Sequence, residues 1–156
     1  MANEKDQGTP LRLMAQDADD LTIVASALES AVTRPDAMTW RRGERRFAVL
    51  FNRFRWETVR GARRPKTMFE RIQSGLVIDG VLSVSRQGFA PGGAEPVLEL
   101  LTIAVEQTTA PAAQVTLVFA GGALVRLDVE CIEAVLSDRG KPWTTPRKPD
   151  HGLKAE

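Results

Sequence analysis

The residues best suited to chemistry gather in one short stretch, from Asn52 to Glu57, which combines two arginines with aromatic, amide and carboxylate side chains. An arginine guanidinium is planar and always charged, so it can bind an anion or stack on an aromatic base. The candidate ligand-binding residues are this stretch and two arginines of the basic loop after it: Asn52, Arg53, Arg55, Trp56, Glu57, Arg63 and Arg64. The alternative, which we prefer, is a strand end where Trp56 fills the core and the arginines pair with acidic neighbours.

The sequence lacks the signatures of the common catalytic and cofactor sites. His151 is the only histidine and Cys131 the only cysteine, so one chain supplies neither a two-histidine metal site nor a disulfide. The pairs Gly92-Gly93 and Gly121-Gly122 lack the spacing and the following lysine of a phosphate-binding loop. We therefore expect no metal and no cofactor, and we expect Cys131 to be a buried structural thiol.

The net charge of +1 conceals a strong segregation along the chain. Residues 32–74 carry a net charge of +8, almost all from arginine, whereas residues 1–31 and 75–140 carry −4 and −5. Such a basic block suits a nucleic-acid or phosphate ligand, and it equally suits pairing with the acidic parts of the same chain. We prefer the pairing, and we keep nucleic-acid or phosphate-ligand binding through residues 41–71 as the alternative.

Apolar spacing predicts one α+β domain over residues 11–140, between a disordered N-terminus (1–10) and an extended basic tail (141–156). A short strand comes first, and a helix then begins with Asp17 as its N-cap and ends near Thr33. Residues 47–56 form a long strand with Phe47, Val49 and Phe51 on one face, continued by Arg53 and Arg55. We expect that face to open to solvent or to a ligand at its end.

The second half of the chain predicts mostly antiparallel strands. Asp79-Gly80 marks a hairpin turn or a bulge within one strand. Residues 115–130 form a hairpin that turns at Gly121-Gly122, where we expect a loop of odd length with a glycine bulge. An odd loop places one apolar face on both strands, because it pairs Phe119, Leu117 and Val115 with Val125, Leu127 and Val129. Residues 131–138 fit a short C-terminal helix, with a strand as the rival interpretation. Together these elements predict a sheet of about seven strands, and their order would suit a PH-like roll.

The composition also predicts the protein's surroundings. No apolar run is long enough to cross a membrane, and one thiol suits a reducing compartment, so we expect a cytoplasmic protein without a membrane partner. Exposed strand edges make a homodimer a reasonable expectation.

Four stretches together resemble a known family: residues 11–32, RRFAVLFNRFRWE at 45–57, residues 98–106, and VTLVFAGGALVRLDVECIEAVLSDRGKPW at 115–143. The family is an uncharacterised domain of unknown function from alphaproteobacteria. It has no assigned activity, so the resemblance implies only a small cytoplasmic bacterial protein.

The absence of a convergent catalytic set favours a non-enzymatic binding or interaction domain over an enzyme. An enzyme of unrecognised type would use Asn52, Arg53 or Glu57.

Overall fold

The computed structural model describes residues 9–57 and 69–145 of the chain. The elements of the first half are β1 (Arg12–Ala15), α2 (Ala18–Ala27), β2 (Val32–Thr33), η1 (Pro35–Ala37), β3 (Met38–Arg41), η2 (Arg42–Glu44) and β4 (Arg46–Phe54). Those of the second half are β5 (Phe69–Asp79), β6 (Val81–Gln87), β7 (Leu98–Gln107), β8 (Ala113–Phe119), η3 (Ala120–Gly122), β9 (Leu124–Val129) and β10 (Ala134–Thr145).

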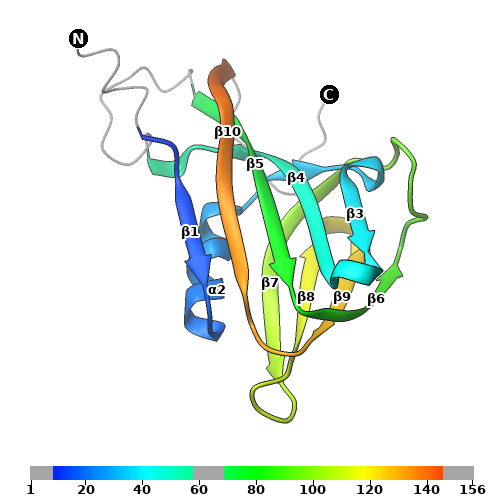
Figure 1. Cartoon of the computed structure of the whole chain (residues 1–156). Coiled ribbons are helices and arrows are strands. Elements are labelled where there is room, and N and C mark those ends of the chain that lie inside the picture. The colour runs from blue at the N-terminus through cyan, green and yellow to red at the C-terminus, as the bar shows by residue number, and fades with distance from the viewer. Residues whose placement is uncertain (1–8, 58–68, 146–156) are drawn as a thin grey trace.

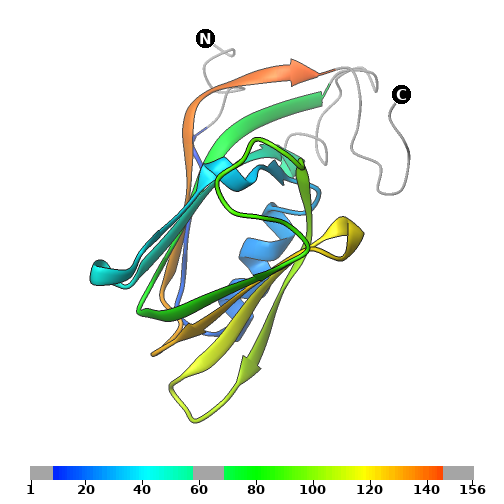
Figure 2. The same cartoon turned by 90° about the vertical axis from the view of Figure 1, so that its right-hand side faces the viewer.

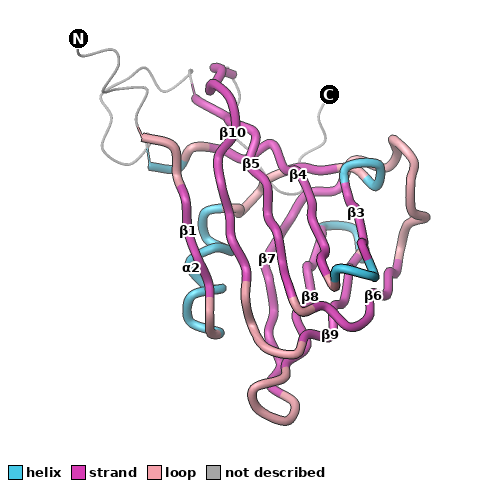
Figure 3. Tube along the Cα trace, viewed as in Figure 1, coloured by secondary structure: helices cyan, strands magenta, loops and turns pink. Residues whose placement is uncertain are grey.

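The ten strands of the described residues form one antiparallel sheet in the order β1-β10-β5-β4-β2-β7-β8-β9-β6, with β3 paired to β4. Figure 1 shows β10, β5, β4 and β3 as a front layer and β7, β8 and β9 behind them. Figure 2, turned by 90°, shows the two layers facing each other, while Figure 3 shows how far strands outweigh helices. The short strand β2 joins the layers by pairing with both β4 and β7. The sheet therefore curves around its own core and stays open between β1 and β6.

Strict alternation along the strands builds this core. In β8 the buried residues Ala113, Val115, Leu117 and Phe119 alternate with half-buried ones, and β4 buries Phe47, Val49 and Phe51 in the same way. Because successive side chains of a strand point to opposite faces, each strand gives one apolar row to the space between the layers. The expected faces of β4 are confirmed.

The helix begins as predicted and ends earlier than predicted. The Asp17 side chain accepts a hydrogen bond from the backbone N–H of Asp20, 2.8 Å away, as expected of an N-cap. The helix ends at Ala27 and not near Thr33. The backbone N–H of Ser30 donates to the carbonyl of Leu100, and the N–H of Leu100 donates to Ala31. Pairing with β7 therefore replaces the last expected turn of the helix.

The hairpin turn expected at Asp79-Gly80 is wrong, because β5 and β6 do not pair with each other. The alternative of a bulge within one strand is closer, since only Gly80 separates β5 from β6. Strand β6 pairs with β9, so the chain turns a corner at Gly80 from the front layer to the rear. Gly80 has a φ of +71°, and its carbonyl accepts the N–H of Glu130. Only a non-local partner distinguishes this corner from a hairpin, and the sequence does not show the partner.

The predicted C-terminal helix at 131–138 is also wrong, and the rival strand is right. Strand β10 lies between β1 and β5, and it buries Ala134 and Leu136 at a period of two. It continues to Thr145, so residues 141–145 of the expected tail lie in this strand, and the rest of that tail lies outside the described residues.

The β8–β9 hairpin confirms the predicted odd loop and apolar face. Its register differs by two residues, since Leu117 pairs with Val125 and Val115 with Leu127. The turn contains a short 3-10 segment with positive φ at both Gly121 and Gly122, in place of the simple bulge expected. The α+β class and the mostly antiparallel sheet are confirmed, with ten strands where about seven were expected.

Candidate functional site

The arginine predicted as the centre of a binding site lies inside the sheet, in an ionic cluster. The side chain of Arg53 is 0% exposed and forms two hydrogen bonds to Asp138, from Nε to Oδ1 (2.9 Å) and from Nη2 to Oδ2 (3.0 Å). It forms two more to Glu57, at 3.1 and 2.7 Å, and one to the carbonyl of Phe54. Every face of the guanidinium fork that could hold an anion is therefore already occupied.

Asp138 completes the cluster with two further partners. Its Oδ1 accepts the hydroxyl of Ser74 at 2.6 Å, and its Oδ2 accepts the backbone N–H of Leu11 at 2.8 Å. Burial raises the pKa of Asp138, but the hydrogen bonds from Arg53, Ser74 and Leu11 lower it by more, so this pKa lies below its ordinary value. The carboxylate is thus charged, fully hydrogen-bonded and only 1% exposed.

The second predicted arginine is paired in the same region. Arg55 is 4% exposed, and its guanidinium donates to the carboxylate of Glu70 and lies 3.7 Å from that of Glu57. Burial raises the pKa of Glu57, but the hydrogen bonds from Arg53 and from the Glu57 backbone, together with the charges of Arg53 and Arg55, outweigh it and leave this pKa lowered. The expectation that this face opens to solvent at Arg53 and Arg55 is wrong, because Glu57, Glu70 and Asp138 cover both guanidinium groups.

The remaining predicted residues do not join this cluster. Asn52 is on the opposite face of β4. Trp56 is partly exposed, packs edge-on against Phe54 with ring centroids 4.5 Å apart, and donates its indole N–H to the carbonyl of Glu29. Trp56 therefore packs between Phe54 and the segment after α2, and it is not among the core residues. Arg63 and Arg64 lie outside the described residues.

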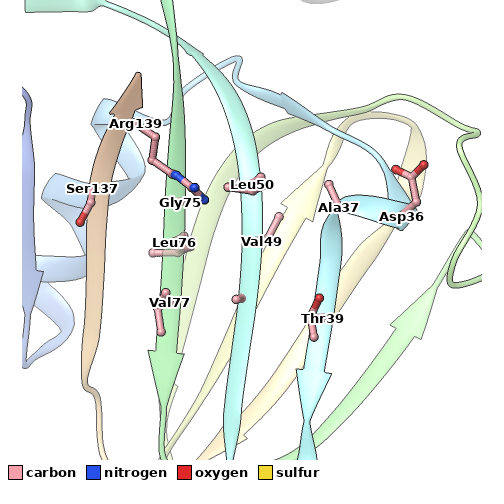
Figure 4. Close-up of a pocket in the computed structure, with 11 residues that line it drawn as sticks. Asp36, Ala37, Thr39, Val49, Leu50, Gly75, Leu76, Val77, Ser137 and Arg139 are labelled. Atoms are coloured by element: carbon pink, nitrogen blue, oxygen red, sulfur yellow. The ribbon is translucent and has the colours of Figure 1, made fainter. Parts of the chain in front are cut away.

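The outer face of the same strands carries an open groove that the sequence analysis missed. Its first part, about 400 Å³, lies over β10, β5, β4 and β3, as Figure 4 shows. A second part of about 560 Å³ continues over β2 to Val97, and the two parts share Asp36, Ala37 and Leu50. Together they form a continuous groove, here called the outer groove.

Gly75 forms the floor of the outer groove. It pairs directly with Leu50 on one side and Ser137 on the other, with no bulge at this point in either pairing. A Cβ at this position would lie 3.6 Å from Leu50 Cδ2 and 3.9 Å from Arg139 Cδ, which are ordinary contacts. Figure 4 shows the Arg139 side chain reaching across Gly75 toward Leu50.

Polar groups border this floor on the β10 side. Asn52, Gln73 and Arg139 occupy one register row across β4, β5 and β10, and Ser137 lies beside Gly75 in the next row. None of these four side chains forms a hydrogen bond or ion pair with another residue in the described part of the chain. A glycine within the apolar run around Leu76 was the one available sequence signal for this site.

Among the described residues, no group of three or more His, Cys, Asp or Glu side chains is placed to hold a metal ion. None of the helices in residues 9–57 and 69–145 is long and apolar enough to cross a membrane.

The fold and the site define a class: an open antiparallel sheet wrapped around its core, with a neutralised ionic cluster inside and a groove outside. The chain belongs to the family described as Protein of unknown function (DUF2948), which matches residues 11–151. No curated protein matches the chain, and no solved structure does. The resemblance drawn from the sequence is thus confirmed as far as the family.

Proposed function

We propose that this chain is a non-enzymatic binding domain of the alphaproteobacterial cytoplasm, and that its ligand lies in the outer groove. One observation carries the proposal: Gly75, at the centre of an eleven-residue strand, leaves a depression bordered by polar side chains without partners in the described residues. Glycine inside a strand costs stability and marks a bulge, a bend or the close approach of another molecule. The pairing at Gly75 is unbroken, which excludes a bulge, and only the exposed Arg139 side chain crosses it, so we propose that Gly75 allows the close approach of a ligand.

The inner cluster supports a binding role over catalysis. Arg53, Ser74 and Asp138 have side chains that are at most 1% exposed, so a substrate cannot touch them in this arrangement. Their charges and hydrogen bonds are directed at one another, as expected of groups that stabilise a fold. The single thiol, Cys131, suits the reducing compartment of this proposal.

The proposal is tested by two-dimensional NMR of the full chain during a screen of small fragments at neutral pH. We expect the amide signals that shift to cluster on β4, β5 and β10 around Gly75, and we expect Gly75→Val to remove these shifts. Shifts clustered on the β7–β9 layer, or shifts that persist in Gly75→Val, would contradict a ligand site in the outer groove.

A further inference from the structure

The polar groups at the β10 end of the outer groove indicate what kind of ligand fits it. Ser137 pairs in register with Gly75 on one side and with Arg12 of β1 on the other, and Arg139 follows on the same outer face. Arg12 and Arg139 are both exposed, and neither forms a hydrogen bond or ion pair with another described residue. Diagonal neighbours on adjacent strands lie roughly 7–8 Å apart, so the backbone places Arg12 and Arg139 on either side of the Ser137 hydroxyl. The Arg139 side chain extends across Gly75, away from Arg12, and has to turn back toward β10 before both guanidinium groups can hold one anion.

Other exposed arginines of the front layer are differently placed. At the far end of β4, Arg45 pairs with Glu130, and Arg46 pairs with Asp79 at 2.8 Å. Those guanidinium groups have their anions within the chain. Around Ser137 the described residues supply none, so an anion from a ligand would complement the two charges.

The rest of the groove suits a polypeptide. The carboxamides of Asn52 and Gln73 follow Arg139 in one row, and a carboxamide offers the donor and acceptor that a peptide bond needs. From β10 to Val97, just before β7, the groove crosses four strand spacings, about 19 Å, which matches about six residues of extended chain. Leu50, Ala37 and Val97 line it with apolar surface.

We infer that the outer groove binds an extended acidic segment of a partner protein. In this arrangement the exposed Arg139 side chain turns off Gly75, so that a carboxylate of the segment lies between Arg12 and Arg139, and the backbone of the segment follows Gln73 and Asn52 across the floor that Arg139 has uncovered. The residues that line the groove include no aromatic ring on which nucleic-acid bases would stack, so the observations favour a peptide over an oligonucleotide. This inference rests on the proposed function, because it requires the groove to be the binding surface.

The experiment measures fluorescence polarisation of the full chain with positional-scanning libraries of fluorescein-labelled hexapeptides. Pools with Asp or Glu fixed at one position should bind at least about tenfold more tightly than matched Asn or Gln pools, because an arginine–carboxylate pair is a charge-assisted hydrogen bond. The double variant Arg12→Ala/Arg139→Ala should lose this preference. Arg126→Ala is the matched control, since this exposed arginine lies on β9 in the other layer, and it should keep the preference.

Further outcomes separate the inference from the proposed function. If acidic and neutral pools bind equally well, and both Gly75→Val and Gly75→Ala weaken that binding, the preference for an acidic segment is overturned. The outer groove would still be the binding site. If a ten-nucleotide oligothymidylate binds more tightly than every peptide pool, and Gly75→Val weakens that binding, the inference that the ligand is a peptide is overturned. Binding that both Gly75 variants leave unchanged, or no binding to any pool, would overturn both.

Discussion

The two faces of β4, β5 and β10 carry polar side chains in opposite circumstances. Each inward residue is followed or preceded in sequence by an outward one: Arg53 and Asn52, Ser74 and Gln73, Asp138 and Arg139. The inward residues bond to one another and are buried, whereas the outward ones have no such partner among the described residues. A step of one residue along a strand therefore separates a group that stabilises the fold from a group available to a ligand.

Removing the central cation should give the largest effect on stability. Arg53→Met leaves the Asp138 carboxylate buried without its main partner, and breaking a buried ion pair costs about 3–5 kcal/mol. Urea unfolding of the full chain at neutral pH measures this loss. If Arg53→Met unfolds at the wild-type urea concentration, the inner cluster does not stabilise the fold.

A matched pair of variants sharpens this result. Arg46→Met removes an ion pair that lies at the surface, so its loss should be far smaller. Arg53→Met/Asp138→Leu replaces both buried charges by apolar groups and should be more stable than Arg53→Met alone. A double variant that is less stable than the single one would show that each charge also acts through other partners.

Acid should remove the stability that Asp138 contributes to the inner cluster. The hydrogen bonds to Asp138 outweigh the effect of its burial and hold its folded-state pKa below the ordinary value, about 3.9. As the pH falls, the unfolded chain therefore takes up this proton first. The stability that Asp138 contributes is complete above that unfolded-state value and is lost as the pH falls toward the folded-state pKa.

Urea unfolding between pH 7 and pH 3 follows this loss. The wild-type free energy of unfolding should fall steeply below about pH 4, and Asp138→Asn should show a shallower fall. Equal slopes in the two proteins would contradict an ionised, hydrogen-bonded Asp138.

Two glycines should respond to substitution in opposite ways. Gly75→Ala adds a Cβ that fits the available space, so the free energy of unfolding should stay unchanged or rise by up to about 1 kcal/mol. Gly88 has a φ of +92°, and a Cβ there would lie 2.8 Å from the Cα of Ala123, so Gly88→Ala should lower it by at least about 1 kcal/mol. A loss of similar size in Gly75→Ala would mean that Gly75 serves the fold.

Short-range patterns were enough to predict much of the fold. The N-cap at Asp17, the faces of β4 and the parity of the β8–β9 hairpin depend on residues close in sequence, and all three are confirmed. The end of α2, the corner at Gly80 and the strand β10 depend on distant partners, namely β7, β9 and the β1–β5 gap. Those partners decide between helix, hairpin and strand where local propensity leaves the choice open.

The candidate site was predictable only in part, for the same reason. The sequence identified Arg53 and Arg55 as unusual residues in a strand, but their acidic partners Glu70 and Asp138 lie up to 85 positions away. The outer groove was missed because its signal is an absent side chain at Gly75. That absence becomes visible only when β4 and β10 are placed beside it.

The division between the two faces is tested most directly by one matched pair of serines. The Ser74 hydroxyl donates to buried Asp138 at 2.6 Å, whereas the hydroxyl of Ser137, on the neighbouring strand and the outer face, forms no hydrogen bond within the described residues. The measurement is the free energy of unfolding in urea of Ser74→Ala and Ser137→Ala. We predict a loss of about 1–2 kcal/mol for Ser74→Ala and a change within about 0.5 kcal/mol for Ser137→Ala. Equal losses, or a larger loss for Ser137→Ala, would contradict the account.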